Sequence, residues 1–521
     1  MKSFLITAFL NFAGPVTFLA FLLWAYSIFT LAKSRWVDSK REWGISGLWA
    51  LAATTVAFLS TSVDFKVLSD ETNLLSVANM LTLFGKASNT EMWLYYYHTF
   101  HALDVSVPSR PILFPVLTAL VHGVVGMKTW SPFVVNFFCL AGLFFLTLEW
   151  GRKRLAGYAR PIVTLGLLMS PVLLIVATSA GFDLCSLFFG FLSFLLLGRF
   201  LEKKEEAVEQ ALYFTLVCFA SVRYESIVAL PLVAGWIWWQ DRGRPLPWKL
   251  FAVLVPLLLP LFIQRYLTWG SFENPADKAP FSLFHLREHG PVFLRAFFID
   301  GRGPYPIVLH WLGAFGLLWF LRRAKVSSLL PLLYGIFLSV LLLAHHFGFA
   351  DHPTQARLFL PLSFGLSALG LFFLSEVKPD ARGLLAVFAL LFFHHHQYTV
   401  HDPLMTQLTM TREVRHLRDF LAEETKGRGD LFVYDRPGQL VALGHSAVSW
   451  TYWEENKKGI LENLKNHLYQ RVFLLEKVRY TGLGFDASLE RDGYRLVPTR
   501  EHQLTPEERL RISRVELKLA P

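Results

Sequence analysis

The sequence has few charged residues, few cysteines and none of the short motifs that bind nucleotides. Charged residues make up 17% of the 521 residues, against about 25% in soluble domains, so an ordinary soluble protein is excluded. There is no Gly-rich phosphate loop, no Asp-x-Asp signature and no nucleic-acid motif. The cysteines all fall in apolar stretches, so no disulfide is expected: Cys139, Cys185 and Cys218.

What the chain has instead is apolar sequence. Hydrophobic residues make up 53% of it, Phe alone occurs 48 times and the mean hydropathy is +0.40. This composition predicts a polytopic α-helical membrane protein. The first apolar stretch, 4–31, has no small-residue cleavage site before the basic run 33–41, so we interpret it as a membrane span rather than a cleaved signal peptide.

Short basic connections predict the topology, because Lys and Arg accumulate on the cytoplasmic side of a membrane. The connections expected there are 33–41, 152–160, 199–204, 242–249, 322–325 and 378–382. Between consecutive connections the chain must cross the membrane an even number of times. With the N-terminal span, about twelve spans satisfy this rule, and the other eleven are 44–63, 131–150, 161–179, 182–200, 208–223, 225–240, 249–267, 306–323, 327–347, 358–375 and 383–397. Both termini are then extracytoplasmic.

Residues 111–126 are apolar but only about 16 residues long, and they contain two prolines and a histidine. Counting them as a span would place the basic residues 152–160 outside. We therefore predict an interfacial or re-entrant helix within a long outer loop, 64–130, which holds a second such helix at 72–84.

Asp70 and Glu71 are adjacent carboxylates at the start of this outer loop. A polar loop at a membrane surface often carries acids without any function. The surrounding sequence is nevertheless built to lie in lipid, so an acidic pair here is a candidate general base or metal ligand.

The chain changes character after residue 400. Residues 411–425 form a charged amphipathic pattern, and 430–435 and 470–475 are typical of buried strands. This predicts a small extracytoplasmic α/β domain at 401–521, after an N-terminal transmembrane helix and cytoplasmic loop at 1–43 and a main transmembrane domain at 44–400. The domain either covers a site, selects an acceptor or is a purely structural cap.

Several segments along residues 44–400 occur in a familiar order. The acidic pair follows a span and precedes an amphipathic helix, and the later segments are Arg110-Pro111-Ile112-Leu113, Gly151-Arg152-Lys153-Arg154, Ser179-Ala180-Gly181-Phe182-Asp183, Arg223-Tyr224-Glu225 and Gln355-Ala356-Arg357-Leu358-Phe359-Leu360-Pro361. In this order they resemble the GT-C superfamily of polyprenyl-phosphate-sugar-dependent glycosyltransferases. The most similar branch contains protein mannosyltransferases and the aminoarabinose transferase of lipid A. One departure is that the His-Pro-Pro-Leu common in bacterial members reads Arg110-Pro111-Ile112-Leu113 here.

The resemblance implies an enzyme of the bacterial inner membrane that acts on its extracytoplasmic face. Such an enzyme transfers a sugar from a polyprenyl-phosphate donor to a lipid, glycan or protein acceptor, by one displacement with inversion. Asp70 would be the general base. Glu71 would orient Asp70, bind the acceptor or join a metal site. The absence of an Asp-x-Asp signature favours a lipid-linked donor over a nucleotide sugar.

The departing phosphate needs a cation, and arginine matches phosphate oxygens with a planar fork. Arg357 is the first candidate because of its family-like setting, and Arg287, Arg295 and Arg302 of another outer loop are alternatives. Ordinary solvated or snorkelling side chains would look the same in sequence. Four further residues are candidates for substrate binding, although Arg223 and Glu225 could instead pair structurally: Arg110, Asp183, Arg223 and Glu225.

Histidines accumulate near the ends of two late spans, where a divalent-metal site is an open alternative to ordinary interfacial histidines. The residues are His345, His346, His352, His394, His395, His396 and His401, with Asp351 and Asp402 nearby. No other cofactor is expected, and the expected partners are the donor, the acceptor and membrane lipid, without nucleic acid. Two other classes remain open, a polyprenyl-lipid or glycan flippase, which needs no base, and a glycan polymerase or ligase that uses a diphosphate-linked donor.

Overall fold

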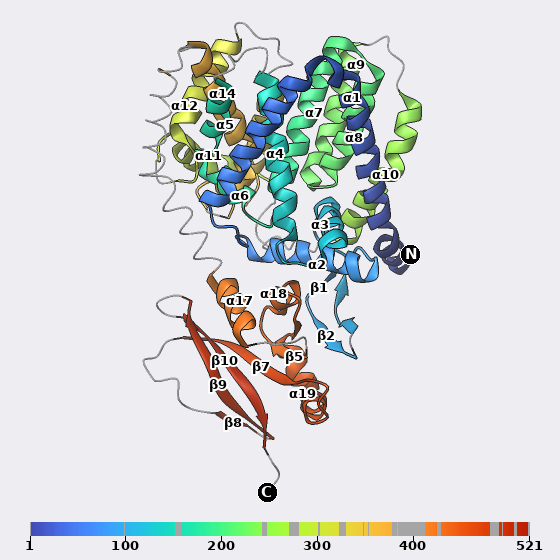
Figure 1. Ribbon diagram of the computed structural model, residues 1–521, viewed down its shortest axis with the longest axis vertical. Coiled ribbons are helices and arrows are strands. Elements are labelled where there is room, and N and C mark those ends of the chain that lie inside the picture. The colour runs from blue at the N-terminus through green and yellow to red at the C-terminus, as the bar shows by residue number, and fades with distance from the viewer. Residues whose placement is uncertain are drawn as a thin grey trace.

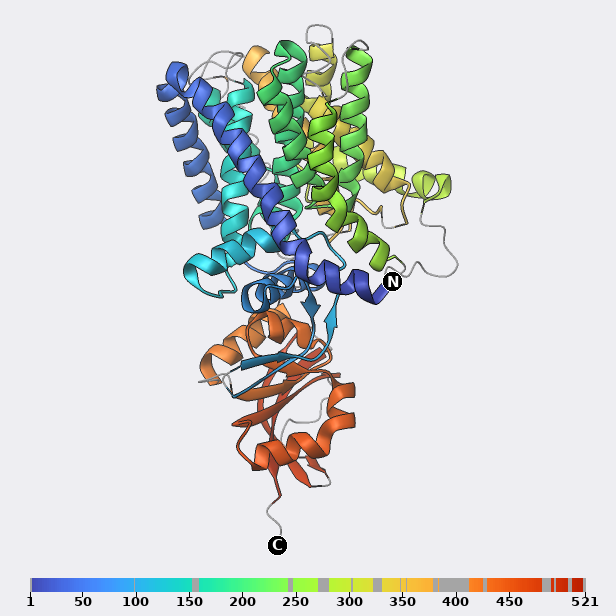
Figure 2. The same cartoon turned by 90° about the vertical axis from the view of Figure 1, so that its right-hand side faces the viewer.

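The protein consists of a helical bundle and, at one end of it, an α/β part built on a mixed sheet (Figure 1). The computed structural model describes residues 2–97, 99–151, 159–241, 247–269, 281–300, 303–321, 330–346, 348–352, 354–377, 383, 412–424, 429–479, 489–491, 493–504 and 508–518. Figures 1 and 2 show the N-terminus at the end of the bundle that faces the α/β part, so the two ends of the described chain lie on the same side of the bundle.

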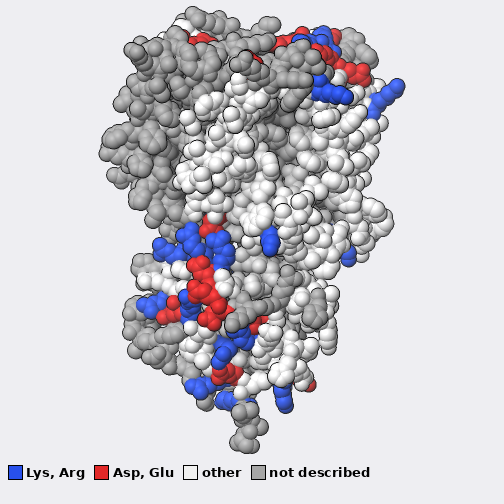
Figure 3. All heavy atoms as spheres, in the orientation of Figure 1, with Lys and Arg blue, Asp and Glu red and all other residues white. Residues whose placement is uncertain are grey.

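Six apolar segments are long enough to cross a membrane, counted over the described residues. They are Lys2–Lys33, Glu42–Ser60, Ser131–Gly151, Asp183–Lys203, Trp248–Leu267 and Ala356–Val377. All six coincide with predicted spans. The first two belong to α1 (Lys2–Ser60), whose two halves run in opposite directions in Figures 1 and 2. On the face drawn in Figure 3, charged atoms lie at the top edge and over the α/β part, and a broad uncharged band separates them. These are the features of an integral membrane protein.

The remaining bundle helices are shorter or interrupted. The prediction of one continuous span at 161–179 is wrong, because the segment divides into α5 (Ala159–Leu167) and α6 (Pro171–Ala177). Pro171 lacks the N–H that would continue α5 and suits the first turn of a new helix. Around the two long helices α4 (Ser131–Gly151) and α7 (Asp183–Lys203), the others are α8 (Glu206–Ala220), η1 (Tyr224–Val228), α9 (Ala229–Gln240), α10 (Trp248–Leu267), α11 (Leu283–Phe298), α12 (Ile307–Leu321), α13 (Leu330–Leu343), η3 (Ala356–Phe359) and α14 (Leu360–Val377). The predicted span 383–397 lies outside the described residues except for Gly383, so the total of twelve stays a prediction.

Close packing fixes α14, the helix that follows η3. A Cβ added to Gly313 of α12 would lie 2.2 Å from the carbonyl oxygen of Leu366, and one added to Gly370 would lie 2.7 Å from that of Leu309. Only glycine lets the two helix backbones approach this closely. The start of α14, where η3 lies, is therefore held against a rigid neighbour.

Two short helices lie at the end of the bundle that faces the sheet. α2 (Leu68–Phe84) runs across this end and α3 (Leu113–Val125) lies beside it (Figure 1). These match the two helices predicted in the outer loop, but α2 begins four residues earlier than predicted. Asp70 and Glu71 consequently lie in the first turn of a helix and not in a loop, where the positive end of the helix dipole favours carboxylates.

The sheet combines strands from two distant parts of the chain. Its order is β3-β2-β6-β5-β7-β10-β9-β8, in which β5 runs parallel to β6 and β7 and the other pairs are antiparallel. The outer loop supplies β2 (Trp93–Tyr96) and β3 (Thr99–Ala102). Trp93 pairs with Ala447, and its Nε1 donates to the carbonyl oxygen of His445 at 2.7 Å. The predicted limit at residue 401 stays a prediction, but the C-terminal residues do not build this sheet alone.

The C-terminal elements complete the sheet and cover its two faces. The strands are β5 (Asp430–Val433), β6 (Ser446–Val448), β7 (Arg471–Arg479), β8 (Leu489–Arg491), β9 (Tyr494–Gln503) and β10 (Glu508–Leu517), and the helices are α17 (Arg412–Glu424), α18 (Pro437–Ala442) and α19 (Trp450–Lys465). α17 and α18 bury Phe420 and Leu440 on one face, while α19 buries Trp453 on the other. A two-stranded ribbon of β1 (Asn89–Thr90) and β4 (Val105–Ser106) stands between α2 and β2. Since α18 packs against α2, the sheet lies directly below the start of α2.

Candidate functional site

Arg357 joins two carboxylates at the end of the bundle that faces the sheet. Its Nη2 lies 2.5 Å from Oδ2 of Asp70, and its Nη1 lies 2.9 Å from Oδ2 of Asp183. The Arg357 and Asp70 side chains are each 14% exposed and Asp183 is 3% exposed. One planar guanidinium therefore connects residues that lie 287 and 174 positions away in the sequence.

Two more arginines extend this network. Arg110 donates from Nη2 to Oδ1 of Asp70 at 2.9 Å and from Nε at 3.2 Å. Arg223 donates from Nη1 to Oδ1 of Asp183 at 2.8 Å and from Nη2 to Glu225 at 3.4 Å. The charges alternate in the order Arg110, Asp70, Arg357, Asp183, Arg223, Glu225. Three cations thus face three carboxylates.

The backbone on either side of the network is held by hydrogen bonds. The Tyr305 hydroxyl donates to the carbonyl oxygens of Ala350 at 3.0 Å and Ala356 at 3.2 Å, which fixes η3 and with it Arg357. Gln264 of α10 donates to the carbonyl oxygens of Pro108 at 2.8 Å and Arg110 at 2.7 Å. The backbone that carries Arg357 and Arg110 is therefore already held in place, and this lowers the entropy that is lost when their side chains bind a ligand.

The turn before Asp183 is held in the same way. The Asn136 amide donates to the carbonyl oxygens of Ser179 at 2.8 Å and Gly181 at 2.9 Å. Asp183 follows as the first residue of α7, where the N-terminal end of the helix favours a carboxylate.

Asp70 is ionised at neutral pH in this arrangement. Burial opposes ionisation, but the guanidinium groups of Arg110 and Arg357 outweigh it and lower the pKa of Asp70 to about 2. A carboxylate of this pKa is a weak base while both arginines contact it.

Glu71 faces away from the arginines into the protein. Its Oε2 accepts the backbone N–H groups of Lys66 at 2.5 Å and Val67 at 2.9 Å, and its Oε1 accepts the N–H of Ala180 at 3.1 Å. Burial raises the pKa of Glu71 to about 7, against the effect of these N–H donors. Both oxygens are engaged with backbone and the side chain is 1% exposed, so this geometry does not fit the predicted acceptor-binding or metal-ligating role. Glu71 instead connects the start of α2 to the turn before Asp183.

Lys66 is a buried cation that the sequence analysis passed over. It is 2% exposed, and its Nζ donates to the carbonyl oxygen of Ile175 at 3.2 Å and to the Thr178 hydroxyl. Burial lowers the pKa of Lys66 to about 7, although Glu71 and Asp64 favour its charged form. The sequence did contain a signal for Lys66, because it stands between the apolar residues Phe65 and Val67. A lysine in such a setting is almost never fully buried unless it has a partner.

The α/β part contacts the same segment through Asp64. Arg415 and Arg418 of α17 each place Nη2 3.1 Å from Oδ2 of Asp64. Asp64 is 2% exposed, and its backbone N–H donates to the carbonyl oxygen of Thr178 at 3.2 Å. Asp64 lies 351 and 354 positions from the two arginines in the sequence, and no local pattern indicates their contact.

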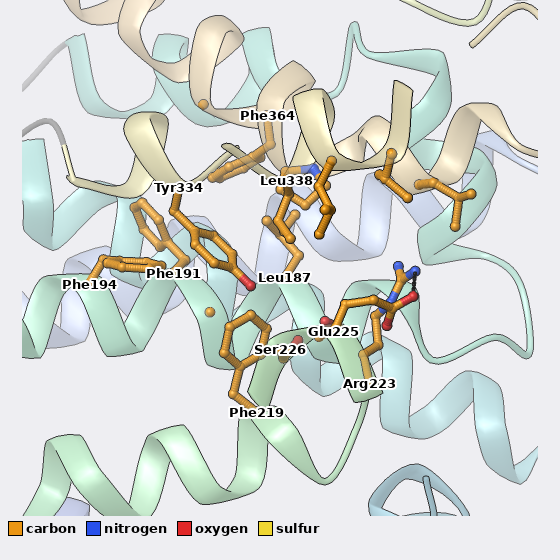
Figure 4. Close-up of a pocket in the computed structure, with 17 residues that line it drawn as sticks. Leu187, Phe191, Phe194, Phe219, Arg223, Glu225, Ser226, Tyr334, Leu338 and Phe364 are labelled. Atoms are coloured by element: carbon orange, nitrogen blue, oxygen red, sulfur yellow. Dashed lines mark hydrogen bonds and ion pairs between the residues drawn. The ribbon is translucent and has the colours of Figure 1, made fainter. Parts of the chain in front are cut away.

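An apolar cavity opens beside the network, between α7, α13 and α14. It has about 680 Å³ of space free of protein atoms, part of it open to solvent. Figure 4 shows Arg223 and Glu225 at one end, and Phe191, Phe194, Tyr334 and Phe364 around the rest. A smaller cavity lies beside Asp183, and its charged residues are Lys66, Asp183 and Arg357 among mostly apolar side chains. The network thus contributes charged residues to both cavities, Arg223 and Glu225 to the larger one and Asp183 and Arg357 to the smaller one.

The structure brings six predicted site residues together, namely Asp70, Arg110, Asp183, Arg223, Glu225 and Arg357. Arg287 and Arg295 are exposed on α11 and have no ion pair with these residues in the described part of the chain. Arg302 lies outside the described residues.

The predicted histidine site can be followed only in part. The rings of His345 and His346 lie 4.4 Å apart, and His352 is exposed. The residues outside the described ones are His394, His395, His396, His401 and Asp402. Within the described ranges, the His, Cys, Asp and Glu side chains close enough to hold a metal are a different set, on α11: His285, Glu288 and His289.

No known family model matches the sequence, and no curated protein is similar to it. Its fold does have counterparts among solved structures. ArnT from Cupriavidus metallidurans bound to undecaprenyl phosphate aligns with a TM-score of 0.54 at 13% identity, over 90% of this chain and 98% of that one. The apo structure of the same ArnT gives a TM-score of 0.55 at 13% identity, over 92% of this chain and 98% of that one. At this identity the likeness concerns the fold alone, and it confirms the expectation, drawn from the order of the sequence segments, that the chain folds like an aminoarabinose transferase.

Proposed function

We propose that this protein is a membrane glycosyltransferase that uses a polyprenyl-phosphate-linked sugar and transfers it, with inversion, to a lipid, glycan or protein acceptor. The observation that carries the proposal is Arg357, which holds Asp70 and Asp183 together in a network that lines both cavities. A cation for a phosphate and a carboxylate for a nucleophile are thereby in contact. The fold adds support, since ArnT with the same fold was crystallised with undecaprenyl phosphate.

The apolar lining of the larger cavity suits the lipid part of such a donor. Its walls are the aromatic and aliphatic side chains of α7, α13 and α14, and its charged residues lie at one end (Figure 4). An isoprenoid chain in this space would place its phosphate beside Arg223 and Arg357. Both guanidinium groups are already close to carboxylates, so a phosphate binds here by replacing carboxylate contacts rather than by recruiting solvated side chains.

When a phosphate replaces Asp70 as the partner of Arg357, Asp70 becomes a stronger base. With Arg357 in contact, the pKa of Asp70 is about 2, too low for efficient removal of a hydroxyl proton. When the donor phosphate draws Arg357 away, Asp70 loses one of its two cations and its pKa rises. Asp70 then accepts the acceptor proton while Arg357 stabilises the departing phosphate. Donor binding and activation of the base are therefore coupled through one side chain.

The neighbouring residues have supporting roles in this proposal. Arg110 keeps Asp70 oriented toward the acceptor side. Asp183 and Glu225 hold Arg357 and Arg223 in place until the phosphate arrives. Glu71 is a positioning residue that fixes the start of α2 and the turn before Asp183.

Substitution of Arg357 tests the proposal. In Arg357→Lys one ammonium replaces a fork that reaches two carboxylates, so we expect the affinity for undecaprenyl phosphate to fall at least about tenfold and transfer from radiolabelled polyprenyl-phosphate sugars to fall with it. Purified protein in detergent is used, so that transport across a membrane is not required.

Arg295→Lys is the control, because Arg295 is exposed on α11. Unchanged undecaprenyl-phosphate affinity in Arg357→Lys would remove Arg357 as the phosphate ligand. Absence of transfer by the wild type across a panel of donor sugars and acceptor classes, with intact lipid binding, would instead favour a flippase.

A further inference from the structure

A second cluster of chemically active side chains lies on α11, outside the arginine–carboxylate network. His285, Glu288 and His289 place one ligand atom each within 4.8 Å of one another. Their spacing of i, i+3 and i+4 puts all three on one face of the helix. In the His-x-x-Glu-His order that zinc enzymes use, the two histidines bind the metal, and the distance of Glu288 from both histidines adds a third ligand here. The histidines are buried and Glu288 is exposed.

The tautomer of His289 is fixed by a contact with another helix end. Its Nδ1 lies 3.0 Å from the carbonyl oxygen of Leu343, at the end of α13. A carbonyl oxygen can only accept, so Nδ1 carries the proton and Nε2 carries the lone pair. Metal-bound histidines very commonly show this arrangement, in which the second ring nitrogen donates to a carbonyl or carboxylate.

The surroundings hold both rings in place. The rings of His285 and His289 are nearly parallel, with an interplanar angle of 8° and centroids 5.7 Å apart. Gly348 lies against His289, and a Cβ there would come within 2.8 Å of its Nδ1. His346 approaches from the α13 side, with its ring centroid 6.5 Å from that of His285. The imidazoles are thus pre-oriented before any ligand is present.

We propose that α11 binds a divalent cation of the Zn²⁺ class through His285, Glu288 and His289. Two imidazoles and one carboxylate suit Zn²⁺, and three protein ligands leave a fourth position for water. A hard cation such as Mg²⁺ would prefer more oxygen ligands than this set provides.

The cation would stabilise the wall behind Arg357. α11 contacts the end of α13 through His289, and its Phe293 packs against Phe359 of η3 at 5.5 Å between ring centroids. A bound cation therefore makes α11 more rigid beside the turn that carries Arg357. It takes no part in sugar transfer itself, and the site stands whether or not the proposed transferase activity is correct.

Metal binding by the full-length protein tests the inference. Protein without a polyhistidine tag is equilibrated with ZnCl₂ in detergent, desalted and analysed for zinc, and its affinity is measured by competition with a chelating fluorophore. We expect one zinc per chain in the wild type and an affinity at least about tenfold lower in Glu288→Gln and in His289→Ala, because even outer contacts of a metal site are worth 10–100-fold. At the same zinc concentration, zinc should also raise the Tm of the wild type more than that of Glu288→Gln.

The control is Glu206→Gln, at an exposed residue at the start of α8. Glu288 is exposed, so Glu288→Gln keeps the test valid if His289→Ala fails to fold. No zinc in the wild type, or equal zinc affinity in the wild type, Glu288→Gln and His289→Ala, would overturn the site.

Discussion

Asp70 and Glu71 are neighbours in the first turn of α2, yet they face two different regions of the molecule. Asp70 points into the network of Arg110 and Arg357. Glu71 points into the backbone of residues 66, 67 and 180. Successive residues of a helix are about 100° apart around its axis, and here this separation directs the two adjacent carboxylates to different neighbours.

The difference in surroundings gives the two groups opposite chemistry. Guanidinium groups lower the pKa of Asp70 to about 2, whereas burial raises that of Glu71 to about 7. Asp70 remains charged and can exchange partners with a ligand. Glu71 is enclosed and can act only through the backbone that it holds. Two substitutions that each remove one negative charge should therefore have different effects, the first on rate and the second on stability.

Asp70→Asn should have the largest effect, and it should act on catalysis. A positioned base contributes typically about 10²–10⁴-fold, so we expect transfer by the purified protein to fall by about that range. The amide is nearly isosteric and still accepts from one arginine, so the Tm should fall less than in Glu71→Gln. The measurement is sugar transfer in detergent together with thermal unfolding.

Asp104→Asn is the matched control, since Asp104 is an exposed aspartate of the same outer loop. Transfer within about twofold of wild type in Asp70→Asn would remove Asp70 as the base. A Tm that collapses in Asp70→Asn would show that the two neighbours do not divide catalysis and stability as their environments indicate.

The sequence predicts the fold where the signal is local. Length and hydropathy locate the six long apolar segments, because a bilayer dictates about 20 residues per helix. They do not locate the break at Pro171, where one hydrophobic stretch becomes two helices. They also give no sign that Trp93 pairs with Ala447, since strand partners so distant in sequence are chosen by tertiary packing.

The candidate site likewise has features that the local sequence predicts and features that it does not. Asp70 and Arg357 can be selected from the chemistry that they would perform. Their mutual contact, and the contact of Asp64 with Arg415 across about 350 residues, depend on the three-dimensional arrangement. The exposure of Arg295, which the sequence offered as an alternative to Arg357, follows from the orientation of α11 and has no local signal.

Glu71→Gln should have the next largest effect, and it should act on stability. A Gln side chain places an NH₂ group where one carboxylate oxygen accepts backbone N–H groups. At least one buried donor loses its partner, which costs about 1–3 kcal/mol. We expect a lower Tm, with transfer reduced less than in Asp70→Asn.

The pH dependence sharpens this prediction. The pKa of Glu71 is higher in the folded protein, about 7, than its usual 4.5, so the folded state binds this proton more tightly than the unfolded state. Its contribution to stability is therefore lost as the pH rises toward 7. Lys66 is protonated in both states below about pH 7, so the Tm difference between wild type and Glu71→Gln should widen from pH 7 to pH 5. Glu91→Gln, at an exposed residue, should show no such trend, and a difference that narrows toward pH 5 would contradict the raised pKa.

The smallest effect on stability and transfer is expected where α17 of the α/β part contacts Asp64, just before α2. In the double variant Arg415→Ala and Arg418→Ala, the buried Asp64 loses two guanidinium partners that are themselves more than a third exposed, so the stability cost should be only about 1 kcal/mol. Asp64 precedes Lys66 and Asp70 and holds Thr178 by its backbone, so transfer should fall by less than about tenfold, equivalent to less than 1.4 kcal/mol. Transfer and Tm are measured beside Lys458→Ala, an exposed cation of α19. If the double variant matches this control in both measurements, α17 merely rests on the bundle, and the environments of Asp70 and Glu71 are set without the α/β part.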